Sequence, residues 1–404
     1  MKAPRRPTHR RGFTLVELMV ALSGGLFVSV MVFALARDTS RFYQREGRLA
    51  SATLAGMMGF ERLKADIARA GYLSTPNIVR DPRVCPAAGR PTQLARLASV
   101  RINADTPSLS GNAAISGAGL TPDEIVLAGS YGATDEFPLR QAAGNTLFLQ
   151  MNVPPMARLG YLAAGLTAAE QQALLGSVFR AGRILRITDN AGLQHFGVIA
   201  NVTGGLQPQV TLAAAPALVY GGGAQSCGIQ GDCTGCLVSV INVIRYQVRD
   251  LKADGLARFA PLWTASAAAP GEATRTELVR QELDAAGNVI ETGNDLTTEL
   301  IAEYAVDLGF SVTAQLPLAT DAVDLQPGGP NFTQIFDATP ANVGNPQRVR
   351  AVRARLSVRS READRDVEIP GGLYRFRLPD TGVWARVRTF QADIGLPNQE
   401  DILW

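Results

Sequence analysis

The chain has 404 residues, of which 46% are hydrophobic, so it can bury a core and wholesale disorder is excluded. Five of its 39 basic residues and none of its 36 acidic residues lie in the first twelve positions, which leaves a near-neutral body of 34 basic and 36 acidic residues. A protein with nearly equal numbers of basic and acidic residues has no excess positive charge to attract nucleic acid. The two histidines, His9 and His195, offer little material for metal or acid–base chemistry, and His195 is expected to be a structural strand residue.

A long apolar stretch follows the basic N-terminus. Residues 13–36 contain a single charged side chain, Glu17, and would span about 36 Å as a helix, long enough to cross a bilayer. The basic residues in front of it predict that the N-terminus stays in the cytoplasm and that the rest of the protein lies outside.

Three interpretations of this segment compete. A cleaved secretory signal peptide is favoured by Ala34-Leu35-Ala36, but the apolar stretch exceeds the usual length of about 7 to 15 residues. A plain membrane anchor leaves Glu17 unexplained, because a charge inside the membrane costs about 2.5 to 3.5 kcal/mol and normally marks function. The third interpretation accounts for the glutamate and for the residues just before the apolar stretch.

The segment Arg10-Arg11-Gly12-Phe13-Thr14-Leu15-Val16-Glu17 resembles the type IV prepilin signature. The resemblance implies that a prepilin peptidase cuts after Gly12 and that the new N-terminus, Phe13, is methylated. Glycine before the cut lets an extended backbone approach the protease closely. Glu17 would then meet a cation during assembly, either its own Phe13 amine or that of a neighbouring subunit, because an unpaired carboxylate in hydrocarbon is strongly disfavoured.

The helical pattern continues to about residue 70. No proline occurs between Pro7 and Pro76, and Gly71 is a natural C-cap. The second half of this expected helix keeps an apolar face for packing on the outer domain, formed by Phe42, Leu49, Leu54, Met57, Phe60, Leu63 and Ile67. The predicted domains are a leader at 1–12, a spine helix at 13–70 and a β-rich region at 72–404.

The sequence of residues 72–404 predicts mostly β-structure. Together with the long N-terminal helix, this makes the predicted fold class α+β. Short β-branched or aromatic runs between glycine and proline predict strands near 124–128, 146–150, 184–187, 196–200 and 237–246. A capping box predicts one helix at Thr167–Phe179. Alternation over 352–359 predicts a strand whose solvent-exposed face carries Arg353, Arg355, Ser357 and Arg359. A run of acids follows it (Glu362, Asp364, Asp366 and Glu368). Two organisations of this region are compatible with the sequence: a single domain, or two lobes divided near residue 221.

The order of several segments resembles PilW-type minor pilins. They are Phe60–Tyr72, which closes the spine, then Leu278-Val-Arg280, Glu299–Phe310, Val349–Ser360, and finally Arg386–Phe390 with Leu396-Pro-Asn398. This resemblance implies a subunit of the inner membrane and pilus that joins an initiation or tip complex. Its implied partners are other minor pilins, the major pilin and a tip adhesin. A type II secretion pseudopilin would share the leader and spine and remains the alternative.

Four cysteines lie in the predicted extracytoplasmic region: Cys85, Cys227, Cys233 and Cys236. An even number in an oxidising compartment predicts two disulfides, of unassigned pairing. A four-thiolate zinc site and a redox-active Cys-x-x-Cys are the less favoured alternatives, so we expect no metal.

The sequence contains no G-x-S-x-G, H-E-x-x-H, Walker-type loop or EF-hand spacing. We therefore expect that the protein is not an enzyme and that it binds no cofactor. An extracytoplasmic hydrolase is the alternative from a different functional class.

Overall fold

A computed structural model describes residues 13–84, 92–104, 120–216, 218–219, 229–230, 233–264, 275–292, 295–316, 321–336, 344–361, 375–378, 384–402 and 404. The protein forms two compact units, Met1–Ser51 and Ala52–Trp404. Helix α1 (Leu15–Ala68) contributes residues to both. A long apolar helix followed by antiparallel sheets confirms the predicted α+β class. The predicted lobe boundary near residue 221 lies outside the described residues.

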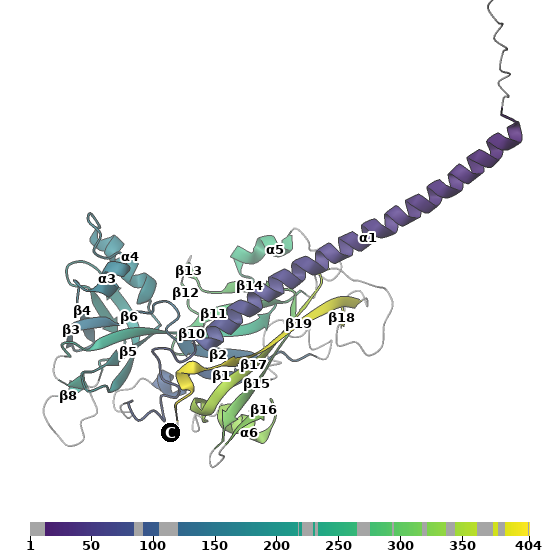
Figure 1. Cartoon of the computed structure of the whole chain (residues 1–404). Coiled ribbons are helices and arrows are strands. Elements are labelled where there is room, and N and C mark those ends of the chain that lie inside the picture. Colours follow the sequence, from purple (N-terminus) through teal and green to yellow (C-terminus); the bar gives the residue numbers. More distant parts are fainter. Residues whose placement is uncertain are drawn as a thin grey trace, which may run out of the picture. The chain divides into compact units, whose positions relative to one another are not determined.

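The centre of the second unit is an antiparallel sheet built around one long strand, β10 (Figure 1). β10 pairs with β2 and β11 along one half and with β5 and β3 along the other. The strands of the first half are β1 (Val100–Asn103), β2 (Glu124–Gly129), β10 (Leu237–Arg249), β11 (Glu277–Leu283) and β14 (Glu299–Glu303). β10 is thirteen residues long and rich in valine and isoleucine, as expected of a central strand buried on both faces.

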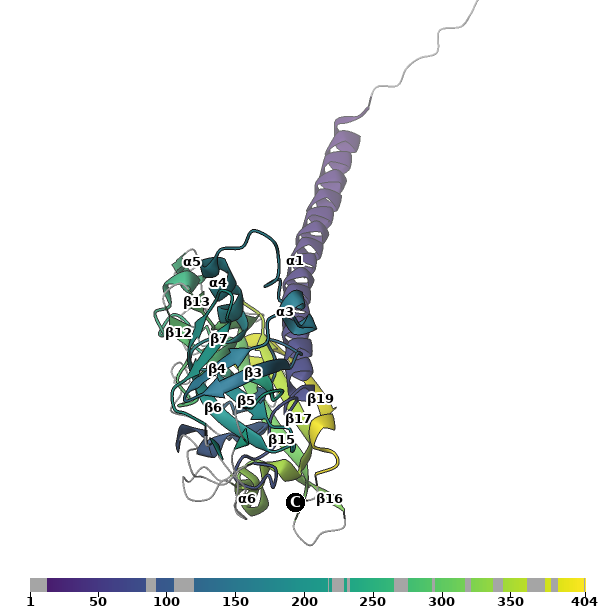
Figure 2. The same cartoon turned by 90° about the vertical axis from the view of Figure 1, so that its left-hand side faces the viewer.

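The other half of this sheet carries two helices and its own apolar core (Figure 2). Its elements are β3 (Phe137–Ala143), β4 (Thr146–Leu149), α3 (Pro154–Arg158), α4 (Ala168–Val178), β5 (Ile184–Thr188), β6 (Gln194–Thr203) and β7 (Gln209–Leu212). The predicted capping box is confirmed, since Thr167 and Glu170 exchange side-chain and backbone hydrogen bonds at the start of α4. His195 is buried in β6, as expected of a structural residue.

A separate five-stranded antiparallel sheet contains the C-terminal strands, in the order β16-β15-β17-β19-β18. Its elements are β15 (Ala305–Gln315), β16 (Ala322–Leu325), α6 (Pro330–Phe336), β17 (Val349–Arg359), β18 (Arg375–Arg377) and β19 (Trp384–Gly395). Short elements complete the unit: η1 (Thr92–Arg96), β8 (Leu218–Val219), β9 (Ile229–Gln230), η2 (Ala257–Phe259), α5 (Ala260–Thr264), β12 (Glu291–Thr292), β13 (Asp295–Leu296), η3 (Pro346–Arg348) and η4 (Pro397–Gln399).

The prediction of a solvent-exposed face on β17 is wrong at the C-terminal end of the strand. Arg353 is half-buried and Arg355 is exposed, and they pair with Asp393 and Asp307. Ser357 and Arg359, which were predicted on the same face, are only 6% and 0% exposed. The guanidinium of Arg359 lies 5.0 Å from the ring centre of Tyr304, a favourable cation–π distance. The four acids expected nearby, Glu362, Asp364, Asp366 and Glu368, lie outside the described residues.

Tyr304 divides the segment Glu299–Phe310 between two strands. Residues 299–310 form two strands, β14 and β15, because Tyr304 takes a positive φ of 55° between them. The backbone thereby leaves the first sheet and enters the second at this residue.

Candidate functional site: the N-terminal helix

The first turn of α1 is capped by the residues of the signature itself. The Thr14 backbone N–H and hydroxyl each donate a 3.0 Å hydrogen bond to Oε2 of Glu17, and the Glu17 N–H donates to the Thr14 hydroxyl at 3.2 Å. This reciprocal pattern is a capping box. Phe13 is exposed beside it, and Gly12 lies outside the described residues. Glu17 therefore has an intrahelical role in addition to the predicted charge pairing.

The helix beyond this cap is apolar and uncovered. Leu15–Ser40 is, among the described residues, the one helix long and apolar enough to cross a membrane, and none of its apolar window is buried. Its 26 residues correspond to about 39 Å, against a hydrocarbon thickness of about 30 Å. A stretch of this kind needs lipid or other helices around it.

Hydroxyl groups within this stretch are satisfied by the helix itself. Ser23 donates to the carbonyl of Val20 at 3.0 Å, and Ser29 donates to that of Gly25 at 2.8 Å. Back-bonding of this kind suits hydrocarbon, where every polar group must find an internal partner.

Further along, in the second unit, two glycines let α1 lie close against the sheets. A Cβ on Gly56 would sit 2.8 Å from the Phe390 ring, and one on Gly59 would sit 2.8 Å from the Ile301 carbonyl oxygen. One turn on, the Phe60 ring stacks on Phe390 at 6.0 Å, and Leu63 is fully buried. These residues recur at helical spacing and form the packed face of the helix.

The predicted apolar face of this segment is only partly right. Phe60, Leu63 and Ile67 are buried, but Leu54 and Met57 are 61% and 53% exposed. Met58 is also exposed, at 67%, so an apolar strip faces away from the sheets. The glycines take the inward positions in this part of the helix. The side chains of Phe42 and Leu49 lie outside the described residues.

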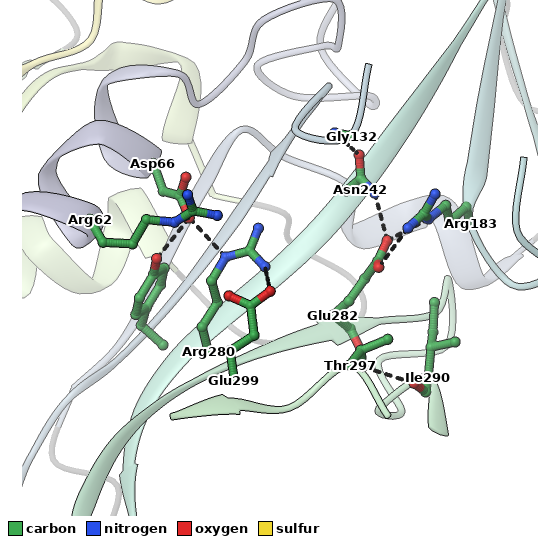
Figure 3. Close-up of polar contacts among 11 residues, drawn as sticks. Arg62, Asp66, Gly132, Arg183, Asn242, Arg280, Glu282, Ile290, Thr297 and Glu299 are labelled. Atoms are coloured by element: carbon green, nitrogen blue, oxygen red, sulfur yellow. Dashed lines mark hydrogen bonds and ion pairs between the residues drawn. The ribbon is translucent and has the colours of Figure 1, made fainter. Parts of the chain in front are cut away.

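The last turns of α1 hold a buried carboxylate, Asp66 (Figure 3). Its Oδ2 accepts hydrogen bonds from the Tyr246 hydroxyl at 2.7 Å and from Nε of Arg280 at 2.8 Å. Arg280 also reaches Glu299 at 3.3 Å, and Arg62 approaches Asp66 at 3.7 Å. Burial disfavours the charged guanidinium, but Asp66 and its neighbours outweigh burial and raise the pKa of Arg280. The helix end is thus bonded to both central strands, β10 and β11.

A second buried network ties α4 to the same sheet (Figure 3). Arg183 binds Glu282 through two hydrogen bonds of 2.6 and 2.9 Å, and it also donates to the Val178 carbonyl at the end of α4. Asn242 donates to Glu282 at 2.6 Å and accepts from the Gly132 N–H at 3.0 Å. Burial alone would raise the pKa of Glu282, but the hydrogen bonds and charge of Arg183 and the bond from Asn242 lower it below its usual value.

The described cysteines, Cys233 and Cys236, form a disulfide in the loop that precedes β10. Both are buried in the core shared with β3 and α4. Cys85 and Cys227 lie outside the described residues, so their pairing stays a prediction. Within the described residues, no group of three or more metal-ligating side chains occurs.

Sequence reasoning missed the residues that fasten the helix. Gly56 and Gly59 were not expected to be packing positions, and Asp66 and Arg280 appeared only within two segments of the family resemblance. One signal for Asp66 was available, since it falls beside Leu63, Ile67 and Ala70 on the helix face that is otherwise apolar. An acidic residue on that face needs a buried partner.

Comparison with known proteins locates one match, at the N-terminus. Residues 7–23 match the model of the prokaryotic N-terminal methylation motif. Neither the curated proteins nor the solved structures contain a match to this sequence. The matched residues include Gly12, Phe13, the capping box and the start of the exposed apolar helix, which is suited to serve as a single-pass membrane anchor. Together they identify a prepilin-like chain, that is, a type IV pilin-like or pseudopilin-type protein.

Proposed function

We propose that this protein is a PilW-type minor pilin that joins an initiation or tip complex of a type IV pilus through α1. The observation that carries the proposal is the methylation motif placed directly on a helix whose apolar surface is uncovered. A prepilin peptidase would cut between Gly12 and Phe13 and methylate Phe13. The protein would act by assembly and not by catalysis.

The packing of α1 within the second unit supports this role. Gly56, Gly59 and Phe60 face the sheets, which leaves Leu54, Met57 and Met58 in solvent on the other side. An apolar strip at i, i+3 and i+4 on an otherwise anchored helix is the pattern expected of a surface that meets another helix. The partners we propose are other minor pilins, the major pilin and a tip adhesin.

The size of the β-rich unit supports a minor and not a principal subunit. Ala52–Trp404 contains 353 residues, for which a compact domain has a radius of gyration of about 20 Å. Helices that pack side by side are separated by only about 8 to 10 Å. Repeating so large a unit at every step of a filament would crowd it against its own copies, whereas a single copy at the tip meets no such clash.

We further propose a periplasmic location for the β-rich unit before assembly, with the N-terminus in the cytoplasm and α1 in the inner membrane. The basic residues of the leader support this orientation. Two disulfides would fit that compartment.

Intact-mass and N-terminal analysis of the protein extracted from membranes tests the processing step. We expect a mature protein that begins at an N-methylated Phe13. A mature N-terminus at Arg37 would instead establish a secretory signal peptide and remove the pilin assignment.

Deletion of the gene then distinguishes the two assembly systems. A minor pilin predicts loss of pili from sheared-cell preparations, although the protein itself is scarce in those filaments. Loss of type II secretion with intact piliation would establish the pseudopilin alternative, and finding the protein as the principal shaft component would exclude a minor role.

A further inference from the structure

A row of residues crosses the central sheet on the face that α1 does not cover. Strand register places Arg101 opposite Val126, Val126 opposite Arg245, and Arg245 opposite Gln281. Their neighbours in sequence, such as Ile102, Ile125, Leu127 and Ile244, are buried in the core with α1. Because successive residues of a strand point to opposite faces, the two arginines share the face away from the helix.

Three residues of this row, Arg101, Val126 and Arg245, line a cavity of about 270 Å³. One wall is the short helix η1 with Arg96, and the other is the turn Asp284–Gly287 that follows β11. Much of the remaining lining is aliphatic, including Leu94, Ile184 and Val243. The cavity therefore combines a cationic end with an apolar body, and it is small enough to hold one residue-sized group.

The carboxylates that line the cavity are already engaged. Glu124 accepts a 2.6 Å hydrogen bond from Asn103 and lies 3.7 Å from Arg245. The side chain of Asp284 points toward its own loop. One of its carboxylate oxygens accepts hydrogen bonds from the backbone N–H groups of Ala286 and Asn288, at 2.9 Å each.

Arg101 is compensated less directly, because Glu124 acts on it through its charge and not through a direct contact. Among the residues that the structure describes, its guanidinium forms no hydrogen bond and no ion pair, although it is partly buried. Burial and the nearby positive charge of Arg96 lower the pKa of Arg101, and the charge of Glu124, which lies in the same cavity lining, offsets them only in part. Holding a partly buried guanidinium without a direct hydrogen bond or ion pair opposes folding, so the fold itself gives little reason for an arginine there.

We propose that this cavity, which we call the Arg101 pocket, binds a carboxylate carried on a small apolar group. Arg101 would hold the carboxylate through paired N–H groups, with Arg96 adding positive charge at the rim. The aliphatic lining would receive the apolar body. A doubly charged phosphate fits less well, because Glu124 and Asp284 lie in the same lining and repel a second negative charge.

Two sources share this chemistry: the C-terminal residue of a partner polypeptide and a free, small aliphatic acid. The proposal is independent of pilus assembly, since it uses no residue of α1. It would hold equally for a pseudopilin.

Isothermal titration calorimetry on the full-length protein in detergent micelles tests the pocket. The probes are N-acetyl-glycyl-leucine with a free carboxylate, the same compound as its amide, 4-methylpentanoate and inorganic phosphate. We expect the free acid to bind at least tenfold more tightly than the amide and than phosphate. Tighter binding of the dipeptide than of 4-methylpentanoate would assign the site to a polypeptide C-terminus, and equal binding would assign it to a free acid.

Two variants connect the binding to Arg101. Arg101→Gln should lower the affinity for the free acid at least tenfold, while Arg388→Gln, which removes an exposed arginine from β19, should leave it unchanged. Without ligand, Arg101→Gln should unfold at the same temperature as wild type or higher, because it removes a partly buried charge that has no direct ion-pair partner. Equal binding of acid and amide, equal binding to wild type and Arg101→Gln, or a clear fall in the Arg101→Gln unfolding temperature would each overturn the proposal.

Discussion

Nε of Arg280, on β11, donates a hydrogen bond of 2.8 Å to Oδ2 of Asp66, near the end of α1, across 214 residues of sequence. Both side chains are buried, and Tyr246 of β10 donates to the same oxygen. The end of the helix is thus joined to two strands through one carboxylate. In a protein that assembles through its helix, this bond would transmit force from the helix to the β-rich unit.

Removal of that carboxylate should be strongly destabilising. Asp66→Ala leaves Arg280 buried with only the exposed Glu299 as an ion-pair partner, and breaking a buried pair costs about 3 to 5 kcal/mol. We expect a loss of that size in the free energy of unfolding, measured by urea titration of the full-length protein in detergent. A loss below about 1 kcal/mol would contradict the role assigned to Asp66.

Two further variants make the comparison specific. Glu61→Ala removes a partner of Lys64 from an ion pair on the exposed side of the same helix, and it should cost no more than about 0.5 kcal/mol. Arg280→Met added to Asp66→Ala should recover part of the stability, because it removes the uncompensated charge.

Glu282 should make folding sensitive to acid. Its pKa is lowered in the folded state, so its contribution to stability is complete above the unfolded-state pKa of about 4.3 and is lost as pH falls through the lower folded value. Glu282→Gln should be less stable than wild type at pH 7 by about 3 kcal/mol. The difference should shrink as the pH is lowered below about 4.3, in urea titrations repeated from pH 7 to pH 3.

Asp307 provides a control of opposite sign. Burial raises the pKa of Asp307 despite the ion pair with Arg355, so its ionisation opposes folding at neutral pH. Relative to Asp307→Asn, wild type should therefore gain stability as the pH falls. Parallel pH trends for the Glu282→Gln and Asp307→Asn differences would show that at least one of the two carboxyl groups lacks the assigned environment.

Gly59 should tolerate no side chain. A Cβ there would lie 2.8 Å from the Ile301 carbonyl oxygen, so Gly59→Ala forces α1 away from the sheet and should cost about 1 to 3 kcal/mol. Gly47→Ala is the matched control, because nothing lies within 4 Å of its Cβ position. Alanine favours a helix by about 1 kcal/mol over glycine, so this variant should be neutral or stabilising. The two would be compared by thermal unfolding, and equal effects would contradict the close packing.

Local features of this fold were predictable because their signals are contiguous in sequence. The prepilin signature, the Thr167–Glu170 box and the valine-rich run of β10 each require only neighbouring residues. Their bounds in the structure differ from the predicted ones by a few residues, as helix and strand ends usually do.

The contacts that hold α1 against the sheets were not predictable in the same way. The bond between Asp66 and Arg280 depends on which turn of the helix faces which strand, a choice made by tertiary packing. The same holds for Arg359, which alternation placed in solvent but whose guanidinium lies over the ring of Tyr304. Glycine at positions 56 and 59 is informative only when the facing side chains are known.

The cysteine pairing follows by elimination from the Cys233–Cys236 disulfide. If all four cysteines are oxidised within one molecule, Cys85 is left with Cys227. Non-reducing peptide mapping should recover these two in one linked peptide. Four free thiols, or one zinc ion per molecule, would defeat the prediction.

Glu17 has two explanations that mutation can separate. As a cap, its carboxylate accepts hydrogen bonds from the backbone N–H and the hydroxyl of Thr14. Loss of a cap costs about 1 kcal/mol of helix stability. As a charge partner, it would pair with the Phe13 amine released by cleavage, on the same subunit or a neighbour. The capping role depends on Thr14 and Glu17 together, whereas the pairing role depends on Glu17 alone.

We therefore expect Glu17→Val to be inserted and processed normally but to fail in assembly, because pairing in hydrocarbon is what its charge supplies. Thr14→Val removes the hydroxyl of the box and keeps the carboxylate, so it should retain assembly. The measurements are membrane content, N-terminal processing and incorporation into sheared filaments for both variants and wild type. Normal incorporation of Glu17→Val would refute the pairing mechanism. Equal loss with Thr14→Val would show that capping of α1, and not charge pairing, is what assembly requires from this motif.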